Sequence, residues 1–169
     1  MDFELTRFEN DERLLSQITS IKTAENIQVL IPFAKAYLGM FYVIDSELAA
    51  IEKVKLLANN ELTEAILAGF ISSLKRDNLP SIEKIGYAMA QKNEFAEGYV
   101  ILAGLDLIAK KSPHEIKGLN LNVIATAIGF HFSNKSGHTN IWFDYLLTEH
   151  ADKVIPAISC YWLAMLKNK

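Results

Sequence analysis

The sequence predicts an all-α protein, a right-handed array of antiparallel helix pairs that forms an α-solenoid of about seven to nine helices. Three observations predict this class. Apolar residues recur at intervals of three and four along most of the chain, the spacing of one helix face. The connectors are only a few residues long, so successive helices run antiparallel. Pro80 and Pro113 lie 33 residues apart and each opens a helix pair, an interval typical of helix-pair solenoids.

The 169 residues fit a single domain. Within it we expect residues 1–45 to form an irregular N-terminal cap and residues 46–169 to form the helix-pair repeats. The repeat lacks the Trp-Leu-Gly-Tyr positions of the tetratricopeptide pattern and is HEAT-like. A compact helical bundle is the alternative architecture.

Helical periodicity and breaker residues divide the chain into segments. The expected helices span about residues 3–20, 24–43, 46–58, 61–75, 82–92, 95–111, 120–132, 141–147 and 149–167. Pro32 lacks the N–H that its turn uses, so we expect a kink or break there. At Pro156 we expect the last helix to kink or restart for the same reason. Gly98, Gly104 and Gly129 lie inside predicted helices at a cost of about 1 kcal/mol each relative to Ala, which indicates close helix packing.

Short polar side chains mark the expected helix starts. Thr23, Ser81 and Asn140 each stand where a side-chain oxygen can accept a hydrogen bond from an otherwise free backbone N–H. The run Ser112-Pro113-His114-Glu115 places a Ser cap, a Pro at the first helical position and a Glu at the third. This is the capping-box pattern, and we expect a helix to begin there.

Composition narrows the possible partners. Hydrophobic residues make up 50% of the chain, the formal net charge is −3, and no dense Lys and Arg cluster of the kind that binds nucleic acid occurs. The start at Met1 does not resemble a signal peptide, and a single cysteine forms no intramolecular disulfide, so we expect a cytoplasmic protein. The stretch from Ile27 to Ile44 is the most membrane-like, but its charge-free part is too short to span a bilayer. We expect a buried helix there, with a peripheral membrane helix as the weaker alternative.

The sequence contains no recognisable catalytic, cofactor or metal motif. Its four histidines, His114, His131, His138 and His150, are not joined by cysteines at ligand spacing. We expect His131 to be partly buried and hydrogen-bonded. Cys160 lies in a strongly apolar segment and is expected to be a small buried hydrophobic residue. The sequence therefore predicts no catalytic residues, no cofactor and no metal.

Several stretches of the second half resemble a known helical region. They are Glu61-Leu62-Thr63-Glu64-Ala65-Ile66-Leu67-Ala68-Gly69-Phe70, Leu79-Pro80-Ser81-Ile82-Glu83-Lys84-Ile85, Tyr99-Val100-Ile101-Leu102-Ala103-Gly104-Leu105-Asp106, Trp142-Phe143-Asp144-Tyr145-Leu146-Leu147 and Val154-Ile155. Over about residues 45–169 the chain resembles the C-terminal helical-repeat region of bacterial proteins that carry a NACHT- or STAND-type NTPase module. The chain has no Gly-x-x-x-x-Gly-Lys-Ser/Thr loop, so that module is absent from it. The resemblance implies a stand-alone or excised repeat module from bacterial defence or signalling, and it transfers no catalytic residue.

Aromatic side chains near the C-terminus are the candidates for an interaction surface. Trp142, Tyr145 and Trp162 belong to the residue types that dominate binding hot spots. The chain ends after an apolar helix, so we expect this helix to pack on a continuation outside this sequence or on a second copy. We therefore predict a non-catalytic helical-repeat interaction or scaffold module that binds a protein partner or itself. The alternative is a small helical ligand-binding protein or enzyme with an apolar pocket around Tyr37, Phe41 and Trp142.

Overall fold

The computed structural model describes residues 11–41, 44–133 and 141–168. Its elements are α2 (Ile18–Lys22), α3 (Ile27–Tyr37), α4 (Ala50–Lys55), α5 (Asn60–Ser73), α6 (Ile82–Ala90), α7 (Gly98–Lys111), the 3-10 helix η1 (Pro113–Gly118), α8 (Leu121–Ser133), α9 (Ile141–Glu149) and α10 (Ala151–Lys167). Residues 11–15 are also helical. The described residues contain no strand, and the predicted all-α class is confirmed. The predicted start at Asn140 and the side chain of His138 lie outside the described residues.

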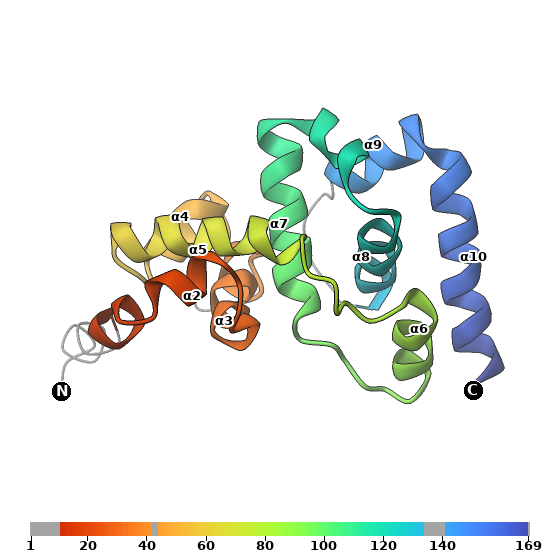
Figure 1. Cartoon of the computed structure of the whole chain (residues 1–169), viewed down its shortest axis with the longest axis horizontal. Helices are drawn as coiled ribbons and strands as arrows, with labels where there is room; N and C mark the ends of the chain where they lie inside the picture. The colour runs from red at the N-terminus through yellow and green to blue at the C-terminus, as the bar shows by residue number, and fades with distance from the viewer. Residues whose placement is uncertain (1–10, 42–43, 134–140, 169) are drawn as a thin grey trace.

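Helix α7 is the centre of the fold (Figure 1). Every residue from Gly98 to Ala109 is buried, because this helix is apolar on nearly all sides. It packs against α3 and α5 and also against α8 and α9. Figure 1 shows α2–α5 on one side of α7, and α6 with α8–α10 on the other. The two halves of the chain thus share α7 as their common core element.

The partner of α6 is not the expected one. The sequence predicts segments 82–92 and 95–111 as a helix pair, but α6 packs against α10 and α8. A Cβ atom on Gly86 would lie only 2.7 Å from the carbonyl oxygen of Tyr161, so the backbones of α6 and α10 are in close contact. The connector 91–97 leads away from α6 before α7 begins. The predicted pairing of segments 82–92 and 95–111 is therefore wrong, because α6 packs against helices that come later in the chain.

Helices α5 and α6 begin with side-chain caps. The Oγ atom of Ser81 accepts a hydrogen bond from the Lys84 N–H at 3.3 Å, and the predicted start of α6 is confirmed. The Oδ1 atom of Asn59 accepts from the Leu62 N–H at 2.9 Å and begins α5 in the same way. Both caps satisfy a backbone donor that has no partner within the helix.

Two predicted starts turn out differently. Thr23 closes α2 instead of opening a helix, and its hydroxyl donates to the carbonyl oxygen of Thr19 at 3.1 Å. The next helix begins at Ile27. The run from Ser112 begins the short 3-10 helix η1, with Pro113 in its first turn and no side-chain cap. Pro113 therefore has the predicted position, whereas the capping box does not form.

Both interior prolines lie within continuous helices. Helix α3 runs through Pro32 and α10 through Pro156, so the expected break does not occur, and the kink that was the other expected outcome at Pro32 stays a prediction. What ends α3 is Gly39, whose φ of 69° is left-handed. The N–H of Met40 donates to the carbonyl oxygen of Lys35 at 2.8 Å, which completes a Schellman motif.

The first part of the membrane-like stretch, Ile27–Tyr37, forms α3. In the part of the chain that the structure describes, no helix is long and apolar enough to cross a membrane. The apolar side chains of α3, including Ile27, Leu30 and Phe33, are buried in the core. The expectation of a buried helix is confirmed, and these side chains do not face outward for a peripheral membrane contact.

Candidate interaction surface

Helix α10 lies at the edge of the molecule, far from the N-terminal helices (Figure 1). It packs against α6, α8 and α9 through one face. Val154 and Tyr161 on this face are fully buried, and Ile158 and Met165 contact the core beside them. These four residues are spaced by four, three and four, as one helix face requires.

A second face of α10, beside the buried one, is also apolar, but it is exposed. The exposed fractions are 59% for Ile155, 41% for Trp162, 55% for Leu163 and 60% for Leu166. Their spacing places them on one face, together with the exposed Ser159. We call this set, Ile155, Ser159, Trp162, Leu163 and Leu166, the outer stripe. Exposed apolar patches of this kind mark binding surfaces.

Charges lie only at the two ends of the outer stripe. Residues 154–166 include no Asp, Glu, Lys or Arg. Asp152 and Lys153 precede this stretch in the first turn, and Lys167 follows it in the last turn. An exposed surface over about three helical turns therefore carries no charge at its centre, a composition typical of the core of a protein interface.

The three candidate residues occupy three different environments. Trp142 is fully buried, so it cannot belong to a surface patch, and that part of the prediction is wrong. Tyr145 is half-buried, with its ring edge-on to His150 at 6.2 Å. Trp162 is exposed and is part of the outer stripe. Cys160, expected to be buried, is exposed as well.

An aromatic cluster lies beneath the outer stripe and holds Trp162 in place. Phe132 stacks on Tyr161 with ring centroids 5.6 Å apart, and it contacts the Trp162 ring at 5.9 Å. The hydroxyl groups of Tyr161 and Ser133 are hydrogen-bonded at 3.2 Å. The exposed Trp162 ring is thus positioned before any partner binds, which reduces the entropy lost on association.

The same cluster contains His131 and Trp142. The His131 ring stacks on Phe143 at 4.3 Å and meets the Trp142 ring edge-on at 5.7 Å. His131 Nδ1 and Trp142 Nε1 are both buried without a hydrogen-bond partner. The predicted partial burial of His131 is confirmed, but the predicted hydrogen bond is not formed at Nδ1. Burial lowers the pKa of His131, and the negative charge of Asp144 opposes this effect without cancelling it.

We expect His131 to make stability depend on pH on the acid side. An unfolded histidine has a pKa of about 6.5 and the folded one a lower pKa, so the unfolded state binds more protons as the pH falls below about 6.5. The free energy of unfolding should fall in this range by at most about 1.4 kcal/mol per pH unit. Urea unfolding between about pH 5 and 7.5 measures the free energy of unfolding at each pH. His131→Phe should flatten its dependence on pH, whereas His114→Gln, at an exposed position, should not. An equal pH dependence in both variants would contradict the attribution of this effect to His131.

No metal site accompanies these histidines in the described residues. No group of three or more His, Cys, Asp or Glu side chains comes together there in an arrangement that could hold a metal ion. His114 is exposed and His150 is half-buried beside Tyr145. The arrangement offers ring stacking and apolar contact.

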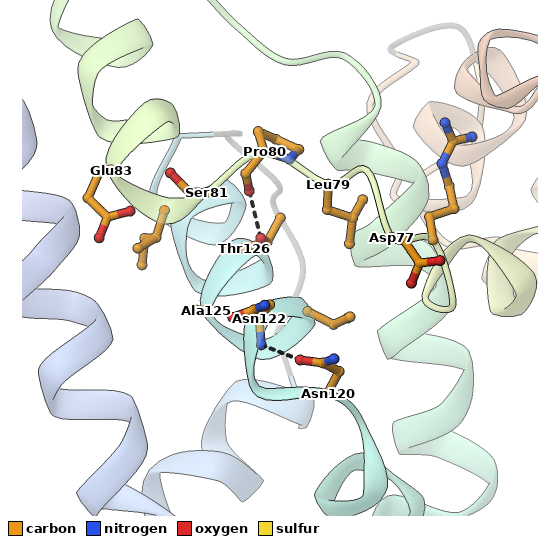
Figure 2. Close-up of a pocket in the computed structure, with 12 residues that line it drawn as sticks. Asp77, Leu79, Pro80, Ser81, Glu83, Asn120, Asn122, Ala125 and Thr126 are labelled. Atoms are coloured by element: carbon orange, nitrogen blue, oxygen red, sulfur yellow. Dashed lines mark hydrogen bonds between the residues drawn. The ribbon is translucent and has the colours of Figure 1, made fainter.

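The hollow in Figure 2 lies between the connector before α6 and the first turns of α8. Its volume is about 400 Å³. Two hydrogen bonds join residues of its wall: the Thr126 hydroxyl donates to the carbonyl oxygen of Pro80 at 2.7 Å, and Asn120 Oδ1 accepts from the Asn122 N–H at 2.8 Å. The Thr126–Pro80 bond fastens the connector to α8, and the Asn120–Asn122 bond caps the first turn of α8, so the hydrogen bonds at the hollow have structural roles. Small-molecule sites are more apolar and more enclosed than this one.

Two residues of the alternative pocket, Tyr37 and Trp142, are buried core side chains. Tyr37 is a core residue whose hydroxyl donates to Asp106 Oδ2 at 2.7 Å. Burial first, and then the hydrogen bond and charge of Asp106, raise the pKa of Tyr37 far above its ordinary value. Lys110 Nζ lies 2.7 Å from the same carboxylate oxygen and over the Tyr37 ring. Neither Tyr37 nor Trp142 lines the hollow in Figure 2 or three further hollows on the described residues.

The comparisons with known proteins return no relative. No family model matches the chain, and neither the curated proteins nor the solved structures include a significant match.

Proposed function

We propose that this chain is a non-catalytic protein-interaction module whose binding surface is the outer stripe of α10. The observation that carries the proposal is the exposure of Ile155, Trp162, Leu163 and Leu166 on one uncharged helix face. Burying such a face is favourable by roughly 25 cal/mol per Å² of apolar surface. The resemblance noted above supports the wider proposal that the module is a HEAT-like repeat unit of a bacterial NACHT- or STAND-type defence or signalling system in the cytoplasm.

The character of this surface favours a protein partner. A nucleic acid requires a cluster of positive charge, and the centre of the outer stripe carries none. The stripe lies on the outward side of a single helix, and a small molecule requires a concave site. A helix that presents apolar residues at intervals of three and four can bind in the groove of another protein or pack against another helix. Trp162, held by the aromatic cluster, supplies the rigid anchor that such contacts use.

Site-specific photo-crosslinking tests this proposal. We would replace Leu163 with p-benzoylphenylalanine in the full chain, expressed in its native host, and irradiate the cells. Leu121 on α8 is the matched control, because both leucines are 55% exposed. Position 163 should yield a protein adduct that mass spectrometry identifies, whether a second copy or a different protein, and position 121 should not. Absence of any adduct at position 163, or equal adducts at both positions, would refute the proposed surface.

A further inference from the structure

We propose that the outer stripe binds the outer stripe of a second copy of this chain, so that two α10 helices pack antiparallel about a two-fold axis. This inference rests on the proposed function and names the partner. Three features of the stripe support this pairing: the order of its large and small side chains, the signs of the charges at its ends, and its exposed area.

The spacing of the stripe matches a helix–helix seam. Ile155, Ser159, Trp162 and Leu166 follow one another at intervals of four, three and four, the pattern of core positions in a coiled coil. An antiparallel register centred between residues 160 and 161 pairs each Ile155 with Leu166 of the second copy. It also pairs each Trp162 with Ser159 of the second copy, so the largest side chain lies against the smallest. A parallel pair in register would instead place Trp162 against Trp162.

The end charges favour the same orientation. Asp152 lies three residues before Ile155, and Lys167 lies four residues after Leu163, so each borders the stripe at one end. Antiparallel packing brings each Asp152 to the Lys167 end of the second copy, which gives two symmetric attractions. Parallel packing would oppose like charges at both ends. Antiparallel helices also align their dipoles favourably.

The exposed area sets the expected strength. The four large side chains of the stripe are each about half exposed, and a side chain of this size has on the order of 200 Å² of surface. The stripe therefore offers roughly 400 Å² per copy. A standard interface buries about 800 Å² per partner, so this pair belongs to the weak class. We expect a dissociation constant on the order of 10–100 µM.

Sedimentation equilibrium of the full chain, from about 5 to 500 µM, measures this association. The wild-type protein should show a reversible monomer–dimer equilibrium. Leu166→Glu places a charge in the seam and should weaken the dimer at least about tenfold. Leu121→Glu, at an exposed leucine on α8, should leave it unchanged. Circular dichroism melting confirms that both variants are folded. A wild-type protein that stays monomeric, or a dimer that Leu166→Glu leaves intact, would overturn the proposal.

Charge reversal tests the antiparallel orientation. Asp152→Lys or Lys167→Asp alone turns both attractions into repulsions and should weaken the dimer about three- to tenfold at low salt. The double variant Asp152→Lys/Lys167→Asp restores opposite charges and should dimerise like the wild type. Both of its changes oppose the α10 dipole, so a gain in helix stability cannot explain the rescue. A double variant weaker than either single variant would overturn the antiparallel pair.

The two proposals can fail separately. A monomeric wild-type protein whose position 163 still crosslinks to a different protein would refute the self-association and leave the interaction module intact. A chain that neither self-associates nor crosslinks at position 163 would refute both. Crosslinking of position 163 to a second copy, with the charge-swap rescue, would support both.

Discussion

Replacing Trp142 with Ala is expected to lower the free energy of unfolding by about 3–5 kcal/mol, the usual loss when a large buried aromatic side chain is truncated. The Trp142 side chain has 0% exposure, and its ring packs edge-on against His131 and Phe143. Its removal would leave a cavity where α8 meets α9, because these rings cannot all move to fill it. Urea unfolding followed by far-ultraviolet circular dichroism measures the loss without relying on tryptophan fluorescence.

Trp162→Ala is the matched control for this prediction. Trp162 is 41% exposed and contacts Phe132 and Tyr161 at its inner edge. Its truncation removes part of a contact and creates no enclosed cavity, so we expect a loss of about 1 kcal/mol. On the proposed function, its main effect should be on association. Similar stability losses for the two tryptophan variants would contradict the different environments that the structure assigns to them.

The helical class of the protein follows from local signals, and the sequence contains them. The apolar residues of α5 and α8 repeat at helical spacing, and the Ser81 cap depends on an atom three residues away. The Schellman motif after α3 is equally local. Gly39 was a usable signal for it, and an end there explains why the predicted helix to residue 43 is too long. Features of this kind depend on residues within one turn and can be read from the sequence, but the caps predicted at Thr23 and Ser112 do not form, so such local signals are not sufficient.

The candidate surface is not readable in this way, because α10 is apolar on two faces. Val154 and Tyr161 define one face, and Ile155 and Leu166 define the other. The spacing of apolar residues in the sequence indicates both apolar faces and does not indicate which of the two faces is buried. The choice is made by α6, which packs on the first face through Gly86. That contact joins distant parts of the chain, and the same contact explains why the α6–α7 pairing was mispredicted.

Aromatic clustering misleads for a related reason. Trp142 and Trp162 both appear in aromatic runs, so the sequence treats them as equivalent candidates. In the structure, α9 turns Trp142 inward to His131, whereas α10 leaves Trp162 at the surface. Cys160 was expected to be buried because its neighbours in the sequence are apolar. Those neighbours include both buried residues, such as Tyr161, and exposed ones, such as Trp162, and Cys160 itself is exposed. Residue type alone does not separate a core residue from an anchor for a partner.

Replacing Gly104 with Ala is expected to destabilise the protein by about 3 kcal/mol, because α5 and α7 cross at this glycine. A Cβ atom there would lie 2.3 Å from the carbonyl oxygen of Phe70 and 2.9 Å from its carbonyl carbon. Both are backbone atoms of α5, so no side-chain rotation can relieve the clash and the two helices must separate. The helix propensity that Ala gains over Gly, about 1 kcal/mol, offsets only part of this cost. Chemical denaturation gives the free energy of unfolding.

Two other glycines make this prediction specific to the helix crossing. At Gly118 an added Cβ meets no atom within 4 Å, so Gly118→Ala should be neutral or stabilising by up to about 1 kcal/mol. At Gly129 the nearest atoms are side-chain carbons of Ile82 and Ile85 at 3.1–3.3 Å, which can shift, so Gly129→Ala should lie between the two. This order follows from what each Cβ would meet. If Gly104→Ala is no worse than Gly129→Ala, backbone contact between α5 and α7 does not require the glycine, and the helices can separate at little cost.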